Sequence, residues 1–358
     1  MDQQFTSEYL KDFIQKVFEA KGMNTYQSSE CAEGLITADL RGIDSHGVAR
    51  LSGYVRLMDA GRLNPNPNIR VVYETPSTAT INADSGSGLY AGQVAMKIAI
   101  EKAKMAGTGW VAVSNSNHFG IAAHHAMLAI PHDMIGIAMT NASPLVSPPQ
   151  SSSRMLGTNP ICIAVPSRKH AHLVLDMATS TAANGKLEIA QRKGKEIPKG
   201  WLVDKNSNES TNANELKAGG ALLPLGSDID HGIHKGFGLA SMVDILSAVL
   251  SGANYGPWVP PFVSFLPLIE NSPGKGIGHF FGAMRVDAFR PIDSYYENID
   301  NWIEKFKSTP ANNIKGRVIL PGEFEDEFYE KRFKEGIPLH DAVVDDLKKL
   351  ATELGLTF

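Results

Sequence analysis

The stretch Arg41-Gly-Ile-Asp-Ser-His-Gly-Val-Ala-Arg50 brings an acid, a hydroxyl, an imidazole and a guanidinium together between two helical patterns. Asp44 and Ser45 are residue types that cap a following helix, because their side-chain oxygens accept the free amides of its first turn. A cap does not explain His46 and Arg50, which at i and i+4 would share one helix face. An imidazole beside a fixed guanidinium suits reduction of a 2-oxo acid, since one group moves a proton at the carbonyl and the other holds the carboxylate.

Helical patterns flank this stretch on both sides. Residues 8–20 and 28–40 carry apolar side chains at helical spacing before it, and a third helix is predicted from Val48 to Ala60. Asn64-Pro65-Asn66-Pro67 breaks the pattern, so we place a domain boundary there. Near the other end of the chain, residues 293–306 and 325–354 again have helical spacing. We therefore predict one helical domain formed from both chain ends, residues 1–68 and 287–358.

The central part of the chain, residues 69–286, alternates short β-branched runs with helical patterns, which is typical of an α/β sheet domain. Predicted helices cover Gly92–Ala106 and Leu239–Leu250. The polar residues 191–220 are interpreted as a surface excursion. The predicted strands are Ile69–Tyr73, Thr78–Asn82, Trp110–Ser114, Met134–Thr140, Ile161–Val165, His172–Leu175 and Gly278–Val286.

One segment of this domain, Gly86-Ser87-Gly88-Leu89-Tyr90-Ala91, matches the dinucleotide-binding fingerprint. The Rossmann fold also needs a carboxylate at the end of the next strand, where it binds the ribose hydroxyls. That strand runs instead into Asn115-Ser116-Asn117-His118, which contains no carboxylate. We therefore prefer a plain turn that uses glycine for positive φ.

Several histidines follow the same strand. His118 lies between an asparagine and Phe-Gly directly after an apolar strand, a poor place for a core residue, so we favour a functional role for it. His124, His125 and His132 add to a metal hypothesis, but the chain lacks the carboxylate and spacing of a known site such as His-Glu-x-x-His. We therefore predict no metal and interpret these three as structural histidines.

Polar loops adjoin other predicted strands: residues 141–144 and 176–180 follow strands, and residues 157–160 precede one. Their amides and hydroxyls can hold a pyrophosphate or ribose, although ordinary turn chemistry is the alternative for each. Lys235 lies beside glycines at a predicted helix start, where amide dipoles and an ammonium favour an anion. A glycine turn with a surface lysine is the alternative there.

Composition limits the classes of function. A length of 358 residues favours two structural units, and 43% hydrophobic with 20% charged residues is ordinary for a globular protein. A net charge of -4 argues against a nucleic-acid or membrane surface. Cys31 and Cys162 are too few for a disulfide framework and suit a reducing compartment. With neither a signal-peptide pattern nor a long apolar run in the sequence, we predict a cytoplasmic protein.

Taken together, these motifs resemble the second type of malate/L-lactate dehydrogenase family, which also contains ureidoglycolate, sulfolactate and diketogulonate enzymes and a cyclic-imine reductase. The resemblance covers nearly the whole chain. The matching segments are Arg41–Arg50, Asn117–Gly120, Thr140–Pro144, Gly157–Pro160, Leu175–Ser180, Ile197–Trp201, Leu222–Gly226, Lys235–Gly238, Pro321–Glu323 and Glu335–Leu339.

The resemblance implies a reductase that uses NAD or NADP, has a cofactor fold other than Rossmann, and forms a homodimer with sites near the subunit interface. It implies that His118 or His46 transfers the proton, with Asp44 in the same catalytic group, and that Arg50 clamps the substrate carboxylate. Ser45, Thr158 and Asn159 are implied near the substrate. The residues implied at the cofactor are Asn141, Asp176, Met177, Ala178, Lys235 and Gly236.

We predict malate and oxaloacetate as the substrate pair; lactate, sulfolactate, ureidoglycolate and a cyclic-imine acid stay open, as does the choice between NAD and NADP. Pro148-Pro149-Gln150-Ser151-Ser152-Ser153 departs from the glycine-containing turn usual at this place in the family, which bears on the pocket wall. Two rival functions remain: a metal-dependent hydrolase built on the histidine-rich helix, and a catalytically silent NAD(P)-binding protein of the same fold.

Overall fold

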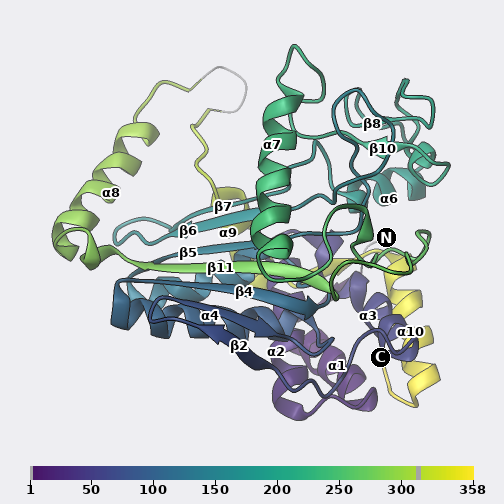
Figure 1. Ribbon diagram of the computed structural model, residues 1–358, viewed down its shortest axis with the longest axis horizontal. Coiled ribbons are helices and arrows are strands. Elements are labelled where there is room, and N and C mark those ends of the chain that lie inside the picture. The colour runs from purple at the N-terminus through teal and green to yellow at the C-terminus, as the bar shows by residue number, and fades with distance from the viewer. Residues whose placement is uncertain (1–2, 312–315) are drawn as a thin grey trace.

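A seven-stranded sheet forms the centre of the computed structural model, which describes residues 3–311 and 316–358 (Figure 1). Within this sheet only β3 and β4 pair in parallel, and every other neighbouring pair is antiparallel. This mixed sheet differs from the parallel sheet of the Rossmann fold. In spatial order its strands are β2 (Arg70–Glu74), β3 (Thr78–Asn82), β4 (Thr108–Ser116), β11 (Ile277–Arg285), β5 (Met134–Thr140), β6 (Ile161–Val165) and β7 (Leu173–Met177).

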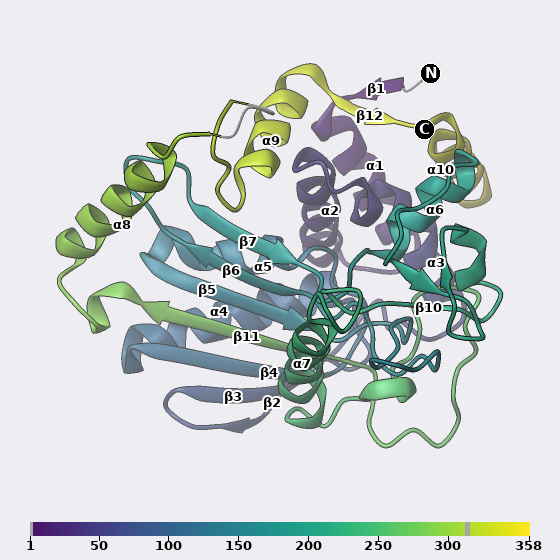
Figure 2. The same cartoon turned by 90° about the horizontal axis from the view of Figure 1, so that it is seen from above.

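Two helices, α4 (Gly88–Ala106) and α5 (Ala122–Ala126), pack on one face of the sheet (Figure 2). Small residues let α4 approach β4 closely. A Cβ on Gly109 would lie 2.0 Å from the carbonyl oxygen of Ala99, so only glycine fits at that point of the strand. The helix buries alanines towards the sheet at Ala91, Ala95, Ala99 and Ala103.

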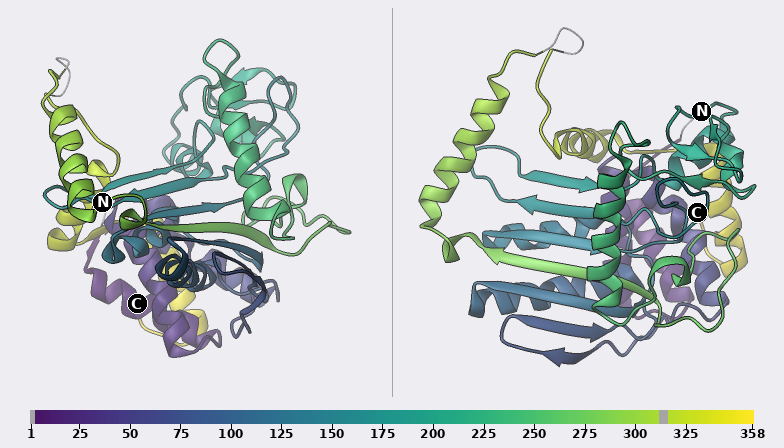
Figure 3. Two further views of the ribbon diagram at one scale, coloured as in Figure 1. Left: turned by 60° about the vertical axis from the view of Figure 1, so that its left-hand side comes forward. Right: turned by 45° about the horizontal axis from the view of Figure 1, so that its top comes forward.

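The opposite face carries α7 (Ile233–Asp244) and the π turn Ile245–Val249 that continues it (Figure 3). This helix crosses the sheet near Gly278, where a Cβ would lie 2.2 Å from the carbonyl oxygen of Ser247. The rest of this face is apolar and only half-buried. The register of the strands places Ile135, Ile137, Met139, Ile161, Ile163, Leu175 and Phe280 on it.

Both chain ends contribute to a helical unit beside the sheet. Helices α1 (Ser7–Ala20), α2 (Thr25–Leu40), α3 (Leu51–Asp59) and α10 (Asp341–Leu354) share one apolar core. The two ends meet directly, since β1 (Gln3–Phe5) pairs with β12 (Ile337–Leu339), and α9 (Glu323–Glu335) contacts α2.

Helix α8 (Ile292–Lys307) lies away from that unit, at the other end of the strands (Figure 2). There the Asp300 carboxylate accepts the backbone N–H groups of Arg168 and Lys169. The carboxy-terminal helices therefore do not all pack on the amino-terminal ones.

A small third unit carries helix α6 (Asn184–Arg192) and a sheet of β8 (Leu202–Val203), β9 (Glu209–Ser210) and β10 (Ala221–Leu222). Its apolar core includes Leu145, Leu187, Ile197 and Leu216. The polar stretch 191–220 therefore carries more structure than the surface excursion that we predicted.

Two predicted helices were wrong in their extent. Residues 325–354 are not continuous helix, because Gly336 has a φ of 93° and Pro338 follows it, so α9 ends and β12 intervenes before α10. The helix predicted from Val48 begins as an α-helix only at Leu51, after two 3₁₀ turns, Asp44–His46 and Val48–Arg50.

The turn before α4 also differs from the prediction. The positive φ values fall on Asp84 and Ser85, at 52° and 59°, and not on its glycines. Gly88 is needed for close approach, because a Cβ there would lie 2.2 Å from the Asn117 carbonyl oxygen. In the described part of the chain, no helix combines the length and the hydropathy needed to cross a membrane.

Candidate active site

The segment that carries His46 and Arg50 is held by a carboxylate from the preceding helix. Asp39 of α2 accepts the backbone N–H of Val48 at 2.7 Å, whereas neither 3₁₀ turn has a side-chain cap of its own. A Cβ on Gly47 would lie 1.8 Å from the nearer Asp39 oxygen, so the backbone rests directly on this carboxyl. Burial raises the pKa of Asp39 to about 8. The capping role that we predicted for Asp44 and Ser45 therefore belongs to Asp39.

Asp44 instead joins the turn to the carboxy-terminal part of the chain. Arg332 of α9 donates to both Asp44 oxygens and to the backbone carbonyl of Asp39. The Arg332 side chain is almost fully buried, whereas Asp44 is half-exposed. Asp44 therefore contributes to the site by positioning the turn, in a pairing that links α9 to α2.

His118 follows β4 and lies against the ring of His46. The two imidazoles are 5.6 Å apart between centroids and nearly parallel, at 17°. Phe262 stacks on the His118 ring at 4.5 Å. The Tyr54 hydroxyl of α3 lies 2.7 Å from His118 Nδ1, which leaves Nε2 as the nitrogen available to a substrate. Tyr54 was not among the predicted site residues; its position on the helix that follows Arg50 was the available signal.

Both histidines are neutral at physiological pH. Burial lowers the pKa of His118 well below its ordinary value, and the positive charges possible on His46 and Arg50 lower it further. Burial, followed by the charge of Arg50, lowers the pKa of His46 to about 4. A neutral imidazole is a proton acceptor, so this pair suits abstraction of a proton from a hydroxyl group.

Arg50 lines a cavity of about 240 Å³ between the turn Asp44–Arg50, α6 and residues 338–343. Its Nε donates to the Ser45 carbonyl, and its Nη2 lies 3.1 Å from Glu188 Oε2 of α6. Residues 148–153, the segment whose sequence differs from the family pattern, are not among the described residues that line this cavity. Ser45 lines it and also bonds His46 Nδ1 through its hydroxyl, at 2.9 Å.

Loop residues that we predicted at the cofactor and substrate lie together next to α7. The Thr158 carbonyl accepts the backbone N–H of Thr179 at 2.9 Å, just beyond Met177 and Ala178, and the Thr179 carbonyl accepts that of Leu225. Gly236 of α7 packs directly against Leu225, since a Cβ on this glycine would lie 2.1 Å from the Leu225 carbonyl oxygen.

Lys235, in the first turn of α7, is exposed, and the described residues include no hydrogen-bond or ion-pair partner for its ammonium. A free cation at a helix N-terminus has the charge and the donors that a diphosphate needs. The residues present therefore fit a nicotinamide dinucleotide.

Two predicted site residues use their side chains to hold these loops, whereas a third, Asp176, faces α5 on the other side of the sheet. Asn141 donates to Asp244 at 2.9 Å and accepts the Gly278 N–H at 3.0 Å. Asn159 donates to the Ala240 carbonyl of α7. The Asp176 carboxylate accepts the Ala123 N–H at the start of α5, and burial raises its pKa to about 6.

The remaining histidines are placed by their own contacts. His124 lies between Gln93 and Thr37, and His125 reaches the Phe119 carbonyl at 2.8 Å, both in the core. His132 is exposed. No cluster of three or more metal-ligating side chains occurs among residues 3–311 and 316–358.

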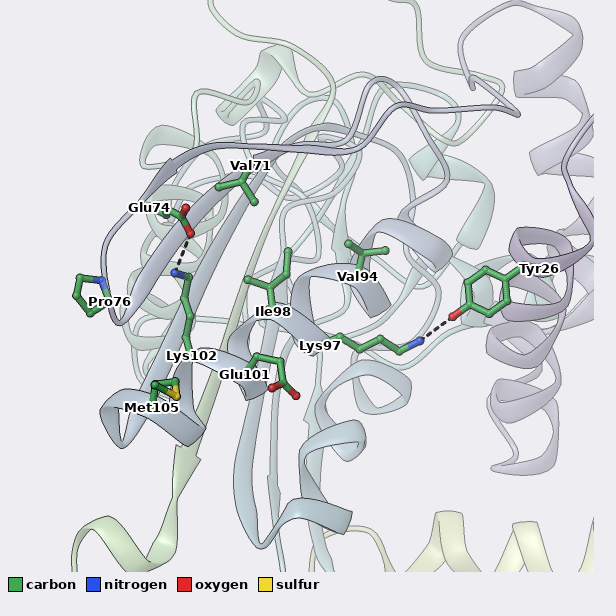
Figure 4. A pocket seen from close by; sticks show the side chains of 10 residues that line it. All are labelled: Tyr26, Val71, Glu74, Pro76, Val94, Lys97, Ile98, Glu101, Lys102 and Met105. Atoms are coloured by element: carbon green, nitrogen blue, oxygen red, sulfur yellow. Dashed lines mark hydrogen bonds and ion pairs between the residues drawn. The ribbon is translucent and has the colours of Figure 1, made fainter.

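A second hollow, on the outer side of α4, contains none of the predicted site residues (Figure 4). Its cations are already paired: Lys97 contacts Tyr26 and Glu30, and Lys102 contacts Glu74. This hollow therefore adds nothing to the predicted site.

Comparison with known proteins agrees with this geometry. The model of the malate/L-lactate dehydrogenase family matches residues 5–348. The chain belongs to this family. It is 42% identical over 348 residues to malate dehydrogenase from Pyrococcus horikoshii, covering 97% of this chain and 94% of that one. It is 37% identical to L-sulfolactate dehydrogenase from Methanocaldococcus jannaschii, covering 97% of this chain and 96% of that one.

The fold agrees as well. The crystal structure of malate dehydrogenase from Entamoeba histolytica superposes with a TM-score of 0.93 at 31% identity, covering 100% of this chain and 99% of that one. The resemblance found in the sequence motifs is thus confirmed. As a member of the malate/L-lactate dehydrogenase family, the protein is an oxidoreductase of 2-hydroxy acids that uses a nicotinamide cofactor.

Proposed function

We propose that this dehydrogenase is cytoplasmic and interconverts malate and oxaloacetate with NAD or NADP. The observation that supports the proposal most is the stacked pair His118 and His46 beside Arg50, since one site with these groups could combine proton transfer with carboxylate binding. The two relatives named malate dehydrogenase from Pyrococcus species, at 42% and 40% identity, support malate among the open substrates.

In the proposed mechanism His118 is the acid and base. Neutral His118 takes the hydroxyl proton of malate at Nε2, and returns a proton to the carbonyl oxygen in the reverse direction. Tyr54, bonded to Nδ1, fixes the ring orientation. Arg50 holds the substrate carboxylate, next to Ser45, so that the reacting carbon is fixed relative to His118.

The nicotinamide ring, when bound, supplies or accepts the hydride. We propose that the loops beside α7 bind this cofactor, with Lys235 meeting its diphosphate and Thr158 and Asn159 facing the substrate side. The residues proposed to line the cofactor are Asn141, Asp176, Met177, Ala178, Lys235 and Gly236.

We further propose that the protein is a homodimer. The α7 side of the sheet combines half-buried apolar strand residues with exposed side chains of α7 and of the π turn that continues it. These are Leu239, Met242, Val249 and Leu250, at 42–59% exposure. Contiguous apolar surface on this scale is unusual for a monomer. A second copy of the chain is the partner that the family resemblance implies for it.

The test is the oxidation of NADH and of NADPH with oxaloacetate, pyruvate, sulfopyruvate and a cyclic-imine acid. We expect oxaloacetate to give the highest kcat/KM. A higher kcat/KM for another acid would show that this acid, and not oxaloacetate, is the preferred substrate. Cofactor binding without turnover of any acid would overturn the proposal in favour of a silent binding protein.

A further inference from the structure

The proposed substrate clamp already holds a carboxylate of the chain itself. Glu188 Oε2 lies 3.1 Å from Arg50 Nη2, and the two side chains are only 22% and 19% exposed. The other Glu188 oxygen accepts a hydrogen bond from Asn184 at 2.8 Å. A guanidinium and a carboxylate in this arrangement are the same two groups that would meet when a 2-oxo acid binds.

Two nitrogens of Arg50 already have partners within the chain. Its Nε is committed to the Ser45 carbonyl, and one of its amino groups faces Glu188. Bidentate binding of a substrate carboxylate draws on two N–H groups of one guanidinium edge. Both bidentate edges of a guanidinium include Nη2, which here faces Glu188. A substrate carboxylate would therefore bring a second negative charge to the nitrogen beside Glu188, and the two carboxylates would compete for it.

A second cation, Arg192, lies close enough to bind Glu188 if a substrate displaces it from Arg50. Arg192, one turn later on α6, has its Nη2 3.8 Å from the same Glu188 oxygen. Glu188, Arg192 and Lys193 all line the cavity of about 240 Å³, so Glu188 has space and a second cation on its own helix when it leaves Arg50. The helix itself is fixed against the turn at Gly185, where a Cβ would lie 2.4 Å from Ser45 Cβ.

We propose that Glu188 is an affinity-setting residue: an internal carboxylate that occupies Arg50 without substrate and moves to Arg192 when a substrate carboxylate binds. This inference rests on the proposed role of Arg50 as the clamp. It assigns to α6 a function in tuning the affinity for anionic substrates, separate from proton transfer at His118.

Removing the charge of Glu188 and removing the charge of Arg192 should change KM in opposite directions. In Glu188→Gln the competitor loses its charge, so KM for the oxo acid should fall about two- to fivefold, the range of a partly exposed ion pair, with kcat unchanged. In Arg192→Gln the alternative partner is lost and Glu188 stays on Arg50, so KM should rise. The double variant should behave like Glu188→Gln.

Glu196→Gln is the matched control, because it removes the same charge from an exposed position just beyond α6. An equal fall of KM in this control would show a general electrostatic effect and overturn the inference. A rise of KM or a fall of kcat in Glu188→Gln would show instead that Glu188 supports the site, which also overturns it.

Calorimetric titration with oxalate separates this inference from the proposed function. Oxalate presents a carboxylate to Arg50 and needs no turnover, so Glu188→Gln should bind it more tightly than the parent protein. If no oxo acid is reduced, the proposed function fails while this affinity difference still decides the role of Glu188. If oxo acids are reduced and both the KM and the oxalate affinity of Glu188→Gln equal those of the parent, only the inference fails.

Discussion

At the scale of single residues, the clearest test concerns His118. Replacing it with alanine should lower kcat by about two to four orders of magnitude, the usual contribution of a positioned acid or base. Steady-state kinetics with oxaloacetate measures the change. His132→Ala is the control, since that histidine is exposed and away from the site. Near-normal turnover in His118→Ala would move proton transfer to His46, whose ring lies beside it.

The pH dependence of malate oxidation tests the electrostatics of the same residue. The pKa of His118 lies below its ordinary value, so the neutral, proton-accepting form persists as the pH falls through that value. We therefore expect kcat/KM for malate to stay on a plateau through about pH 6.5 and to decline only below it. A decline centred above that pH would show that burial does not control this imidazole.

Asp39 offers a stability test, since its raised pKa means that the folded protein disfavours the ionised carboxyl. The ionised form accumulates in the unfolded chain from about pH 4, so the parent protein loses stability as the pH rises to about 8, the folded value. Asp39→Asn keeps an acceptor for the Val48 N–H and should gain relative stability over this range. Urea unfolding at several pH values measures it, and exposed Asp345→Asn should show no such trend.

At the scale of elements, the periodicity of apolar residues predicted where strands lie better than it predicted where helices are interrupted. The bounds of β3, β5 and β6 agree with the sequence expectation, because alternating apolar residues there have one buried face. Helix α6 was missed because its sequence is polar and its packing is set by a distant turn. Gly336 and Pro338 were visible breaks within a helical pattern and should have divided it.

The candidate site was predictable where one short segment concentrates polar groups. His46, Arg50 and His118 stand at a turn or a strand end, and the structure brings the two histidine rings together. The bonds of Tyr54 to His118 and of Glu188 to Arg50 join residues 64 and 138 positions apart, which sequence spacing cannot show.

The link from α9 to the turn Asp44–Arg50 can be tested by removing the side chain of Arg332. Its buried hydrogen bonds to Asp44 and to the Asp39 carbonyl are charge-assisted, so Arg332→Ala should cost about 2–4 kcal/mol of unfolding free energy. Because the turn carries Arg50, KM for the oxo acid should also rise. Lys331→Ala, on the exposed side of α9, is the control. Unchanged stability together with unchanged KM would mean that the turn keeps its conformation without Arg332.

At the scale of the whole molecule, the two faces of the sheet are unequal. Helices α4 and α5 bury one face, whereas α7 covers only part of the other, so apolar strand residues remain half-exposed there (Figure 3). The turn Asp44–Arg50 contacts α2, α3 and α6. In the proposed homodimer, this partly open face of the sheet is the surface that a second copy covers.

Size-exclusion chromatography with light scattering tests this assembly. The parent protein should have twice the chain mass of 38.7 kDa. Met242→Asp should release monomers, because it puts a charge into the apolar face of α7, where burial without a partner is unfavourable. Met105→Lys changes an equally apolar but more exposed residue, at 87%, in the hollow on α4 and should leave the mass unchanged (Figure 4). Dissociation by Met105→Lys alone would move the interface from the α7 face to α4.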